Sequence, residues 1–212
     1  LIKRVQPIIG CTLVKYQLMK RFLLLAMITI ISMAIKADGI NYDRLRISIT
    51  SRLCQLNDYI SFMKDNYNDF ETECYYKKQV LNMFVGRGYD YEEDGVYKDG
   101  VRLQINSKNM SKTRTMLVRV YLNGLVNNTN KDVLIEYPQP ANIKVGDIQI
   151  IDDDNFVCCC YYDQAFVGQT NVTPICRDIT RKKIKCYVER QETEDGFEYS
   201  VLFGDLYAVE TK

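Results

Sequence analysis

Apolar positions recur at helical spacing early in the chain. They are Leu45, Ile49, Leu53, Leu56, Ile60 and Met63. Steps of three and four residues place side chains on one stripe of a helix, so a helix is predicted over residues 43–64. A second helix is predicted over residues 70–85. It should end at Gly86, because glycine readily takes the left-handed conformation that closes helices. Residues 113–126 return to helical spacing and predict a third helix.

The remaining segments are typical of strands. A short alternating strand is expected at residues 101–106. Stretches rich in β-branched and aromatic residues follow at 133–137, 142–151, 155–167, 177–190 and 197–210. In the fourth stretch, Ile184, Cys186 and Val188 alternate with polar neighbours, which predicts one dry face and one wet face. Asp195-Gly196 indicates a hairpin turn between the last two strands. Three helices with a long antiparallel sheet predict an α+β fold.

An acidic loop is expected at residues 88–100. Asp90, Glu92 and Asp94 imitate the first half of a calcium loop, whose alternate acids converge oxygen ligands. The match fails at Lys98 and Val101, where such a loop needs further oxygen ligands. We therefore interpret the segment as a solvated acidic loop, and no metal site is predicted.

The N-terminal segment predicts export. Met19, Lys20 and Arg21 precede a run of thirteen mostly apolar residues at 22–34. A bilayer core takes about 20 apolar residues, so residues 19–37 are interpreted as a signal peptide cleaved after Ala37. An uncleaved anchor or a buried core helix are the alternatives.

This interpretation divides the chain into three parts. Residues 1–18 are interpreted as an upstream extension or a misannotated start, and residues 38–212 as a single domain. No cysteine directly follows the apolar run, so the predicted product is periplasmic or secreted and not a lipoprotein, with no stable membrane span after cleavage.

Charge and composition exclude several function classes. Cleavage would leave 175 residues with 22 basic and 27 acidic side chains, a net charge of −5. This balance does not favour nucleic acid, which usually binds a concentrated basic face. The chain contains no histidine. Catalysis by Ser-His-Asp or Cys-His groups is therefore excluded, as are metal sites ligated by histidine.

The element order resembles the nuclear-transport-factor-two-like (cystatin-like fold) superfamily. The order is ααβαβββββ, and the likeness spans about residues 40–210. It is carried by Ile179-Thr180-Arg181-Lys182-Lys183, which lead into the final hairpin at 178–209, and by residues 121–126, which resemble the end of the third helix. Together with the signal peptide, the chain is similar to uncharacterised exported proteins of Bacteroides-type bacteria. The resemblance implies a strongly curved antiparallel sheet that wraps the helices into a cone with a pocket.

The resemblance allows several functions, since fold alone does not set function. We expect an exported, non-catalytic binding or protein-interaction domain that uses the cone pocket or the sheet face and is able to form a homodimer. Its partner would be a small molecule or a protein, with no cofactor. A small pocket enzyme of isomerase or lyase type is one alternative. A structural cell-envelope component with an exposed apolar sheet face is another.

Five side chains are candidates for the pocket lining. They are Tyr59, Tyr161, Asp163, Asp205 and Tyr207. Asp205 shares a face with Phe203 and Tyr207 if the last strand alternates regularly. It would then be a carboxylate among aromatic rings, where burial can tune proton transfer, or a rim residue hydrogen-bonded to backbone. None of the five matches a catalytic motif.

Seven cysteines remain after the predicted cleavage, and an odd number cannot all pair within one chain. On a strand, Cys158 and Cys160 point one way and Cys159 the other, so the triplet is interpreted mainly as small core residues. Two disulfides stay open, Cys54 with Cys74 and Cys176 with Cys186. A four-thiolate zinc site lacks the paired spacing it would need.

Residues 181–183 form a short basic run, Arg181-Lys182-Lys183. It is interpreted as the solvated start of a strand, with a small anionic contact as the alternative.

Overall fold

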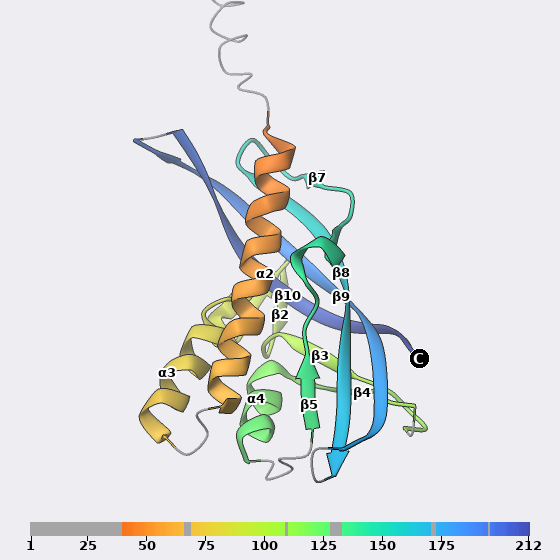
Figure 1. Cartoon of the computed structure of the whole chain (residues 1–212). Coiled ribbons are helices and arrows are strands. Elements are labelled where there is room, and N and C mark those ends of the chain that lie inside the picture. The colour runs from red at the N-terminus through yellow and green to blue at the C-terminus, as the bar shows by residue number, and fades with distance from the viewer. Residues whose placement is uncertain (1–39, 66–68, 109, 128–132, 171–172, 195) are drawn as a thin grey trace, which may run out of the picture. The chain divides into compact units, whose positions relative to one another are not determined.

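The amphipathic segment predicted first forms helix α2 (Tyr42–Asp65) in the computed structural model (Figure 1). The structure describes residues 40–212 apart from 66–68, 109, 128–132, 171–172 and 195, so the predicted export segment lies outside the described residues. Five of the six stripe residues, Leu45, Ile49, Leu53, Leu56 and Met63, are at most 1% exposed. The stripe is therefore the face of α2 that enters the core. None of the helices in the described part is long and apolar enough to cross a membrane.

Helix α3 (Phe70–Leu81) begins at a side-chain cap and ends earlier than predicted. The Asp69 carboxylate accepts the backbone N–H of Glu71 at 3.2 Å, which satisfies a donor that the helix leaves free. The helix was expected to reach Val85, but the chain leaves it four residues earlier and forms a 3₁₀ turn, η1 (Val85–Gly88). Gly86 has φ +66° and Gly88 has φ +86° within this turn, conformations that glycine adopts readily.

The expected acidic loop contains a small hairpin of β1 (Tyr91–Glu93) and β2 (Val96–Lys98). Its turn is Asp94-Gly95, with φ +53° and +74°. These positive values fit the two-residue turn that matches strand twist. Asp90, Glu92 and Asp94 are exposed, which agrees with a solvated acidic segment.

The third predicted helix is shorter than expected because its first turn is a strand. Strand β4 (Arg114–Leu117) pairs antiparallel with β3 (Arg102–Ile105), and helix α4 (Val118–Asn127) follows directly. The helix-like apolar spacing across this boundary is overridden by pairing with β3, a tertiary interaction that local spacing cannot report.

The C-terminal half supplies most of the main sheet. Its strands are β5 (Val133–Glu136), β8 (Asn155–Thr170), β9 (Thr173–Thr193) and β10 (Gly196–Thr211). The sheet order is β4-β3-β10-β9-β8-β5, in which β3 and β10 run parallel and the other neighbours antiparallel. The strand expected at residues 142–151 is instead a short 3₁₀ turn, η2 (Pro140–Asn142), and two short strands, β6 (Lys144–Val145) and β7 (Gln149–Ile150), which pair with β8.

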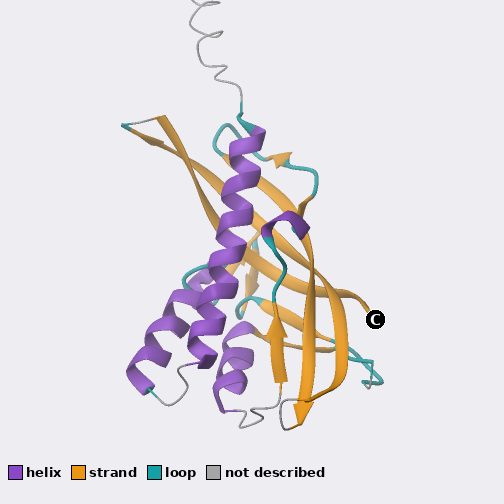
Figure 2. Ribbon diagram, viewed as in Figure 1, coloured by secondary structure: helices purple, strands orange, loops and turns teal. Residues whose placement is uncertain are grey.

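The fold is α+β, with helices α2, α3 and α4 on the same side of the sheet (Figure 2). Residues Tyr42–Lys212 form one compact unit. The inward face of β9 carries Ile184, Cys186 and Val188, all buried, which confirms the predicted dry face. Phe203 of β10 is fully buried, and its ring lies 6.1 Å from that of Phe84. The core therefore lies between the helices and this face.

Candidate functional site

A narrow cavity lies between the helices and the inner face of the sheet. Its walls come from all three helices and from β3, β8, β9 and β10. Its volume is about 40 Å³, room for about three water molecules, since one needs about 10–15 Å³ on this measure. Most of the lining is apolar, including Leu56, Phe84 and Leu122, and the polar exceptions define what the cavity can bind.

Lys182 is the charged side chain that reaches this cavity. It stands on β9 opposite Tyr162 of β8, and only 5% of its surface is exposed. Its Nζ donates a hydrogen bond of 2.7 Å to the backbone carbonyl of Gln104, and no carboxylate within the described residues forms a salt bridge with it. Burial lowers the pKa of this ammonium to about 8, because a low-dielectric surrounding disfavours the charged form.

Asn57 contributes a second donor to the cavity. It lies on α2, is 5% exposed and belongs to the lining. Its Nδ2 has no hydrogen-bond partner within the described part of the chain. A buried polar group without a partner costs about 1–3 kcal/mol, so this amide is an unmet hydrogen-bond donor at the cavity wall.

Three tyrosines and a glutamine complete the polar part of the lining. They are Tyr121, Tyr137, Tyr162 and Gln164. Burial raises the pKa of Tyr121 to about 12. Burial also raises the pKa values of Tyr137 and Tyr162. These phenols therefore stay protonated at neutral pH and offer neutral hydrogen-bonding groups.

Tyr161 and Asp163 lie on the other face of β8. Side chains alternate along a strand, and Cys160, Tyr162 and Gln164 take the inner face. Asp163 is exposed and accepts a hydrogen bond of 3.2 Å from Nε of Arg181 on the neighbouring strand. Both candidates thus belong to the outer surface of the sheet and not to the cavity.

Asp205 and Tyr207 also face outward, because β10 contains a bulge. Phe203 pairs with Cys186 and Leu206 pairs with Ile184, so two residues of β10 stand opposite one residue of β9. The extra residue keeps Phe203 in the core and turns Leu206 into the cavity. Regular alternation, which placed Asp205 with Phe203, therefore does not hold.

The bulge makes Asp205 a rim residue. Its Oδ1 accepts the backbone N–H of Arg102 at 2.8 Å. Its other oxygen lies 3.5 Å from the Tyr207 hydroxyl, so the two predicted residues do lie together, but outside the cavity.

Tyr59 lies on α2 beside α3. Its hydroxyl accepts a hydrogen bond of 2.9 Å from Nε2 of Gln55, and its ring lies 6.0 Å from that of Tyr76. It is half-buried between the helices and is not part of the cavity lining.

An ionic cluster fastens the small hairpin to the outer face of the sheet. The Glu93 carboxylate accepts hydrogen bonds from Lys98, from Lys185 at 2.5 Å and from the Tyr187 hydroxyl. Burial raises the pKa of Glu93, but hydrogen bonds from Lys185 and Lys98 outweigh this and lower it overall. The charged groups of this cluster are paired with one another, so we interpret its role as holding the β1–β2 hairpin against the sheet.

No disulfide joins Cys54 to Cys74, since both are free thiols in the structure. Tyr59 of α2 faces α3, and Cys54 precedes it by five residues, which is about 140° round the helix. The Cys54 thiol therefore does not point at α3. For the second predicted disulfide, the Cys176 side chain lies outside the described residues. Cys186 is a free thiol in the structure, and its Sγ lies 3.6 Å from that of Cys160.

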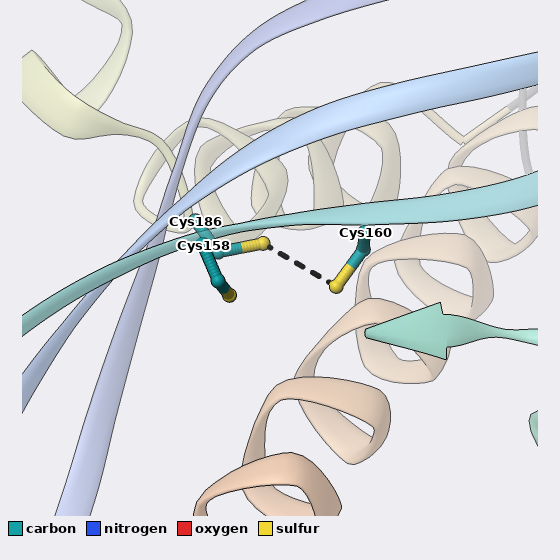
Figure 3. Close-up of side chains that lie close together, drawn as sticks. All are labelled: Cys158, Cys160 and Cys186. Carbon is teal, nitrogen blue, oxygen red and sulfur yellow. Dashed lines mark hydrogen bonds between the residues drawn. The ribbon is translucent and has the colours of Figure 1, made fainter. Parts of the chain in front are cut away.

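Three thiols gather in the core at one place on the inner face of the sheet (Figure 3). Cys158 and Cys160 stand on β8, and Cys186 stands on β9 directly opposite Cys158. Their exposures are 3%, 0% and 0%, and Cys186 Sγ lies 3.6 Å from Cys160 Sγ. Hydrogen bonds from Cys160 and Cys186 lower the pKa of Cys158, and hydrogen bonding to Cys158 raises the pKa values of its two partners.

The two side chains that matter most in the cavity, Lys182 and Asn57, are not among the five candidates. Strand alternation did contain a signal for the lysine, because counting back by two from Ile184 places Lys182 on the dry face. Its charge argued for solvent instead. Asn57 directly follows the stripe residue Leu56, and its burial depends on the packing of α2 against the sheet.

Comparison of the chain with protein-family models, with curated proteins and with solved structures found no match.

Proposed function

We propose that this chain is an exported binding domain of the nuclear-transport-factor-two-like type, whose internal cavity holds a small anion with a short apolar chain. A short monocarboxylate has this chemistry. The observation that carries the proposal is the pair of donors, Lys182 Nζ and Asn57 Nδ2, that line one apolar cavity without a carboxylate partner. A bound carboxylate would supply a negative charge for the Lys182 ammonium and a hydrogen-bond acceptor for Asn57 Nδ2.

The energetic argument concerns the buried ammonium. A charged group buried without a counter-ion is costly, and hydrogen bonds to charged groups are worth about 1.5–3 kcal/mol. The Gln104 carbonyl satisfies one of the three donors that an ammonium carries. An anion would therefore gain a strong, well-shielded interaction at this point. The aliphatic walls would exclude anions that are more strongly hydrated or larger.

The size of the cavity limits the ligand. Space for about three water molecules suits a carboxylate with two to four carbons, and longer chains would have to displace Phe166 or Leu206, which are half-buried at the lining. Binding should therefore be tightest within this range and decline for longer acids.

A binding role is favoured over an enzyme of isomerase or lyase type for two reasons. The described lining contains no aspartate or glutamate that could serve as a carboxylate base. Lys182 would have to act as a neutral amine, but with a pKa of about 8 it is mostly protonated at pH 7. The outer sheet face offers less support as a binding surface, since ion pairs such as Arg181–Asp163 occupy it.

The test is a calorimetric titration of the full chain with acetate, propionate, butyrate, hexanoate and octanoate at pH 7. Lys182→Met, which keeps an unbranched side chain only one atom shorter and removes its charge, should weaken butyrate binding at least tenfold. Lys183→Met is the matched control, because the neighbouring lysine lies on the outer face, and it should bind like the wild type. Equal binding by Lys182→Met and the wild type would refute the proposal.

A further inference from the structure

The three core thiols form a second cluster of reactive side chains, separate from the cavity lining. Cys158, Cys160 and Cys186 are absent from the cavity lining, although they stand on the same inner face. Their three Sγ atoms lie within 4.8 Å of one another. No other set of three or more cysteine or acidic side chains in the described residues converges in this way.

The register of two strands builds this arrangement. Cys158 and Cys160 project from the same side of β8 because they are two residues apart, and Cys186 is the cross-strand partner of Cys158. Figure 3 shows Cys186 directed toward Cys160 from the neighbouring strand. The sulfurs are therefore brought together by regular pairing.

Their spacing suits a single central ion. Metal–sulfur bonds of about 2.3 Å, at angles of about 100–120°, place coordinating sulfurs about 3.5–4.0 Å apart. The Cys160–Cys186 sulfur separation of 3.6 Å lies in this range. All three Sγ atoms lie within 4.8 Å of one another, so small side-chain rotations would bring the other sulfur pairs into the range as well. Thiolates are soft ligands and select soft, thiophilic ions.

The surroundings decide which soft ion fits. Structural zinc takes four ligands, the chain has no histidine, and Cys159 projects to the other face. Water is a poor fourth ligand where the thiols are at most 3% exposed. The site therefore suits an ion that is satisfied by three sulfurs.

The net charge of the complex narrows the choice of ion further. Three thiolates around Cu(I) would bury two net negative charges, and around Zn(II) one. Around a trivalent ion the complex is neutral. The inward residues that flank the thiols are Phe156, Tyr162 and Ile184, which supply no compensating cation.

We propose that Cys158, Cys160 and Cys186 form a three-coordinate sulfur site for a trivalent thiophilic ion of the arsenic(III) class. Binding exchanges ligands without redox chemistry. One arsenous acid, As(OH)₃, reacts with three thiols to give As(SR)₃ and three waters, and each thiol proton leaves in a water molecule. Because the thiols are buried, the ion enters while the chain folds or opens. The site is independent of the proposed carboxylate cavity.

The test refolds the reduced full chain with arsenite, removes free arsenic and measures bound arsenic by mass spectrometry. One arsenic per chain is expected. Cys158→Ala, Cys160→Ala and Cys186→Ala should each lower the affinity at least tenfold. Cys159→Ala is the matched control, since its side chain leaves the same strand on the other face, and it should bind like the wild type.

X-ray absorption at the arsenic edge keeps the proposal testable if a core variant fails to fold. The wild-type complex should show three sulfur neighbours and no oxygen. An oxygen ligand, retention of arsenic by all three alanine variants, or tighter binding of Cu(I) or Zn(II) than of arsenite would each overturn the assignment.

Discussion

Replacing Lys182 by methionine should change how the stability of this protein depends on pH. The wild type buries an ammonium whose pKa burial lowers from 10.5 to about 8. Between these two values the unfolded chain holds the proton and the folded chain does not. Stability from this group therefore rises with pH from about 8 to about 10.5. Below about pH 8 both states are protonated, and the folded state carries the full penalty.

The size of this free-energy penalty follows from the pKa shift of Lys182. Each pKa unit corresponds to about 1.4 kcal/mol, so the full penalty at pH 7 is about 3 kcal/mol. Between pH 7 and pH 9.5, the wild type should gain about 2 kcal/mol of unfolding free energy relative to Lys182→Met. The comparison must be a difference between the two proteins, because the buried tyrosines and thiols titrate in both.

The assay is urea unfolding of both proteins at intervals of pH from 7 to 9.5, without carboxylate in the buffer. Lys183→Met, on the outer face, should keep the wild-type profile. Parallel pH profiles for the wild type and Lys182→Met would refute the reasoning, since they would mean that Nζ is solvated in the folded protein.

Four further substitutions test separate parts of the fold by urea or thermal unfolding. Glu93→Gln should cost about 1–3 kcal/mol, because it leaves two lysines facing a neutral group. It should also remove the loss of stability that occurs in the wild type as pH falls through the lowered pKa of Glu93, and faster hydrogen exchange confined to the β1–β2 hairpin would locate the effect. Gly88→Ala should destabilise, since φ is +86° and a Cβ would lie 2.7 Å from Cδ2 of Leu81. Gly124→Ala, on open helix surface, should stabilise by up to about 1 kcal/mol. A Gly88→Ala variant more stable than Gly124→Ala would contradict the backbone conformations assigned to these two glycines. Phe203→Ala should cost about 3–5 kcal/mol because the ring is fully buried, and a cost below about 1 kcal/mol would mean that this part of the core is not packed as described.

Much of the architecture could be predicted from periodicity. The stripe from Leu45 to Met63 predicted α2, because apolar spacing sustained over about five turns is a strong local signal. The long strands were predicted for a similar reason. The hairpin at Asp94-Gly95 was missed, although this dipeptide is a recognised turn signal, since the acidic residues around it favoured a solvated loop.

The site could be predicted only in part, because it depends on tertiary details. One extra residue in β10 reverses the faces of Asp205 and Leu206, and no local pattern announces a bulge. Asn57 is buried only because α2 packs against strands distant in sequence. The triplet of cysteines showed which two thiols share a face, but their meeting with Cys186 depends on the register between β8 and β9.

The most direct test of the central claim is the titration of the Lys182 side chain itself. Carbon-13 NMR of the full chain, labelled at lysine Cε and assigned with Lys182→Met, reports this pKa with and without butyrate. We expect a pKa of about 8 in the free protein and a higher pKa when butyrate is bound, because a nearby anion favours the charged amine. A pKa near that of a solvated lysine, or one that butyrate leaves unchanged, would contradict the account of the cavity as an anion site.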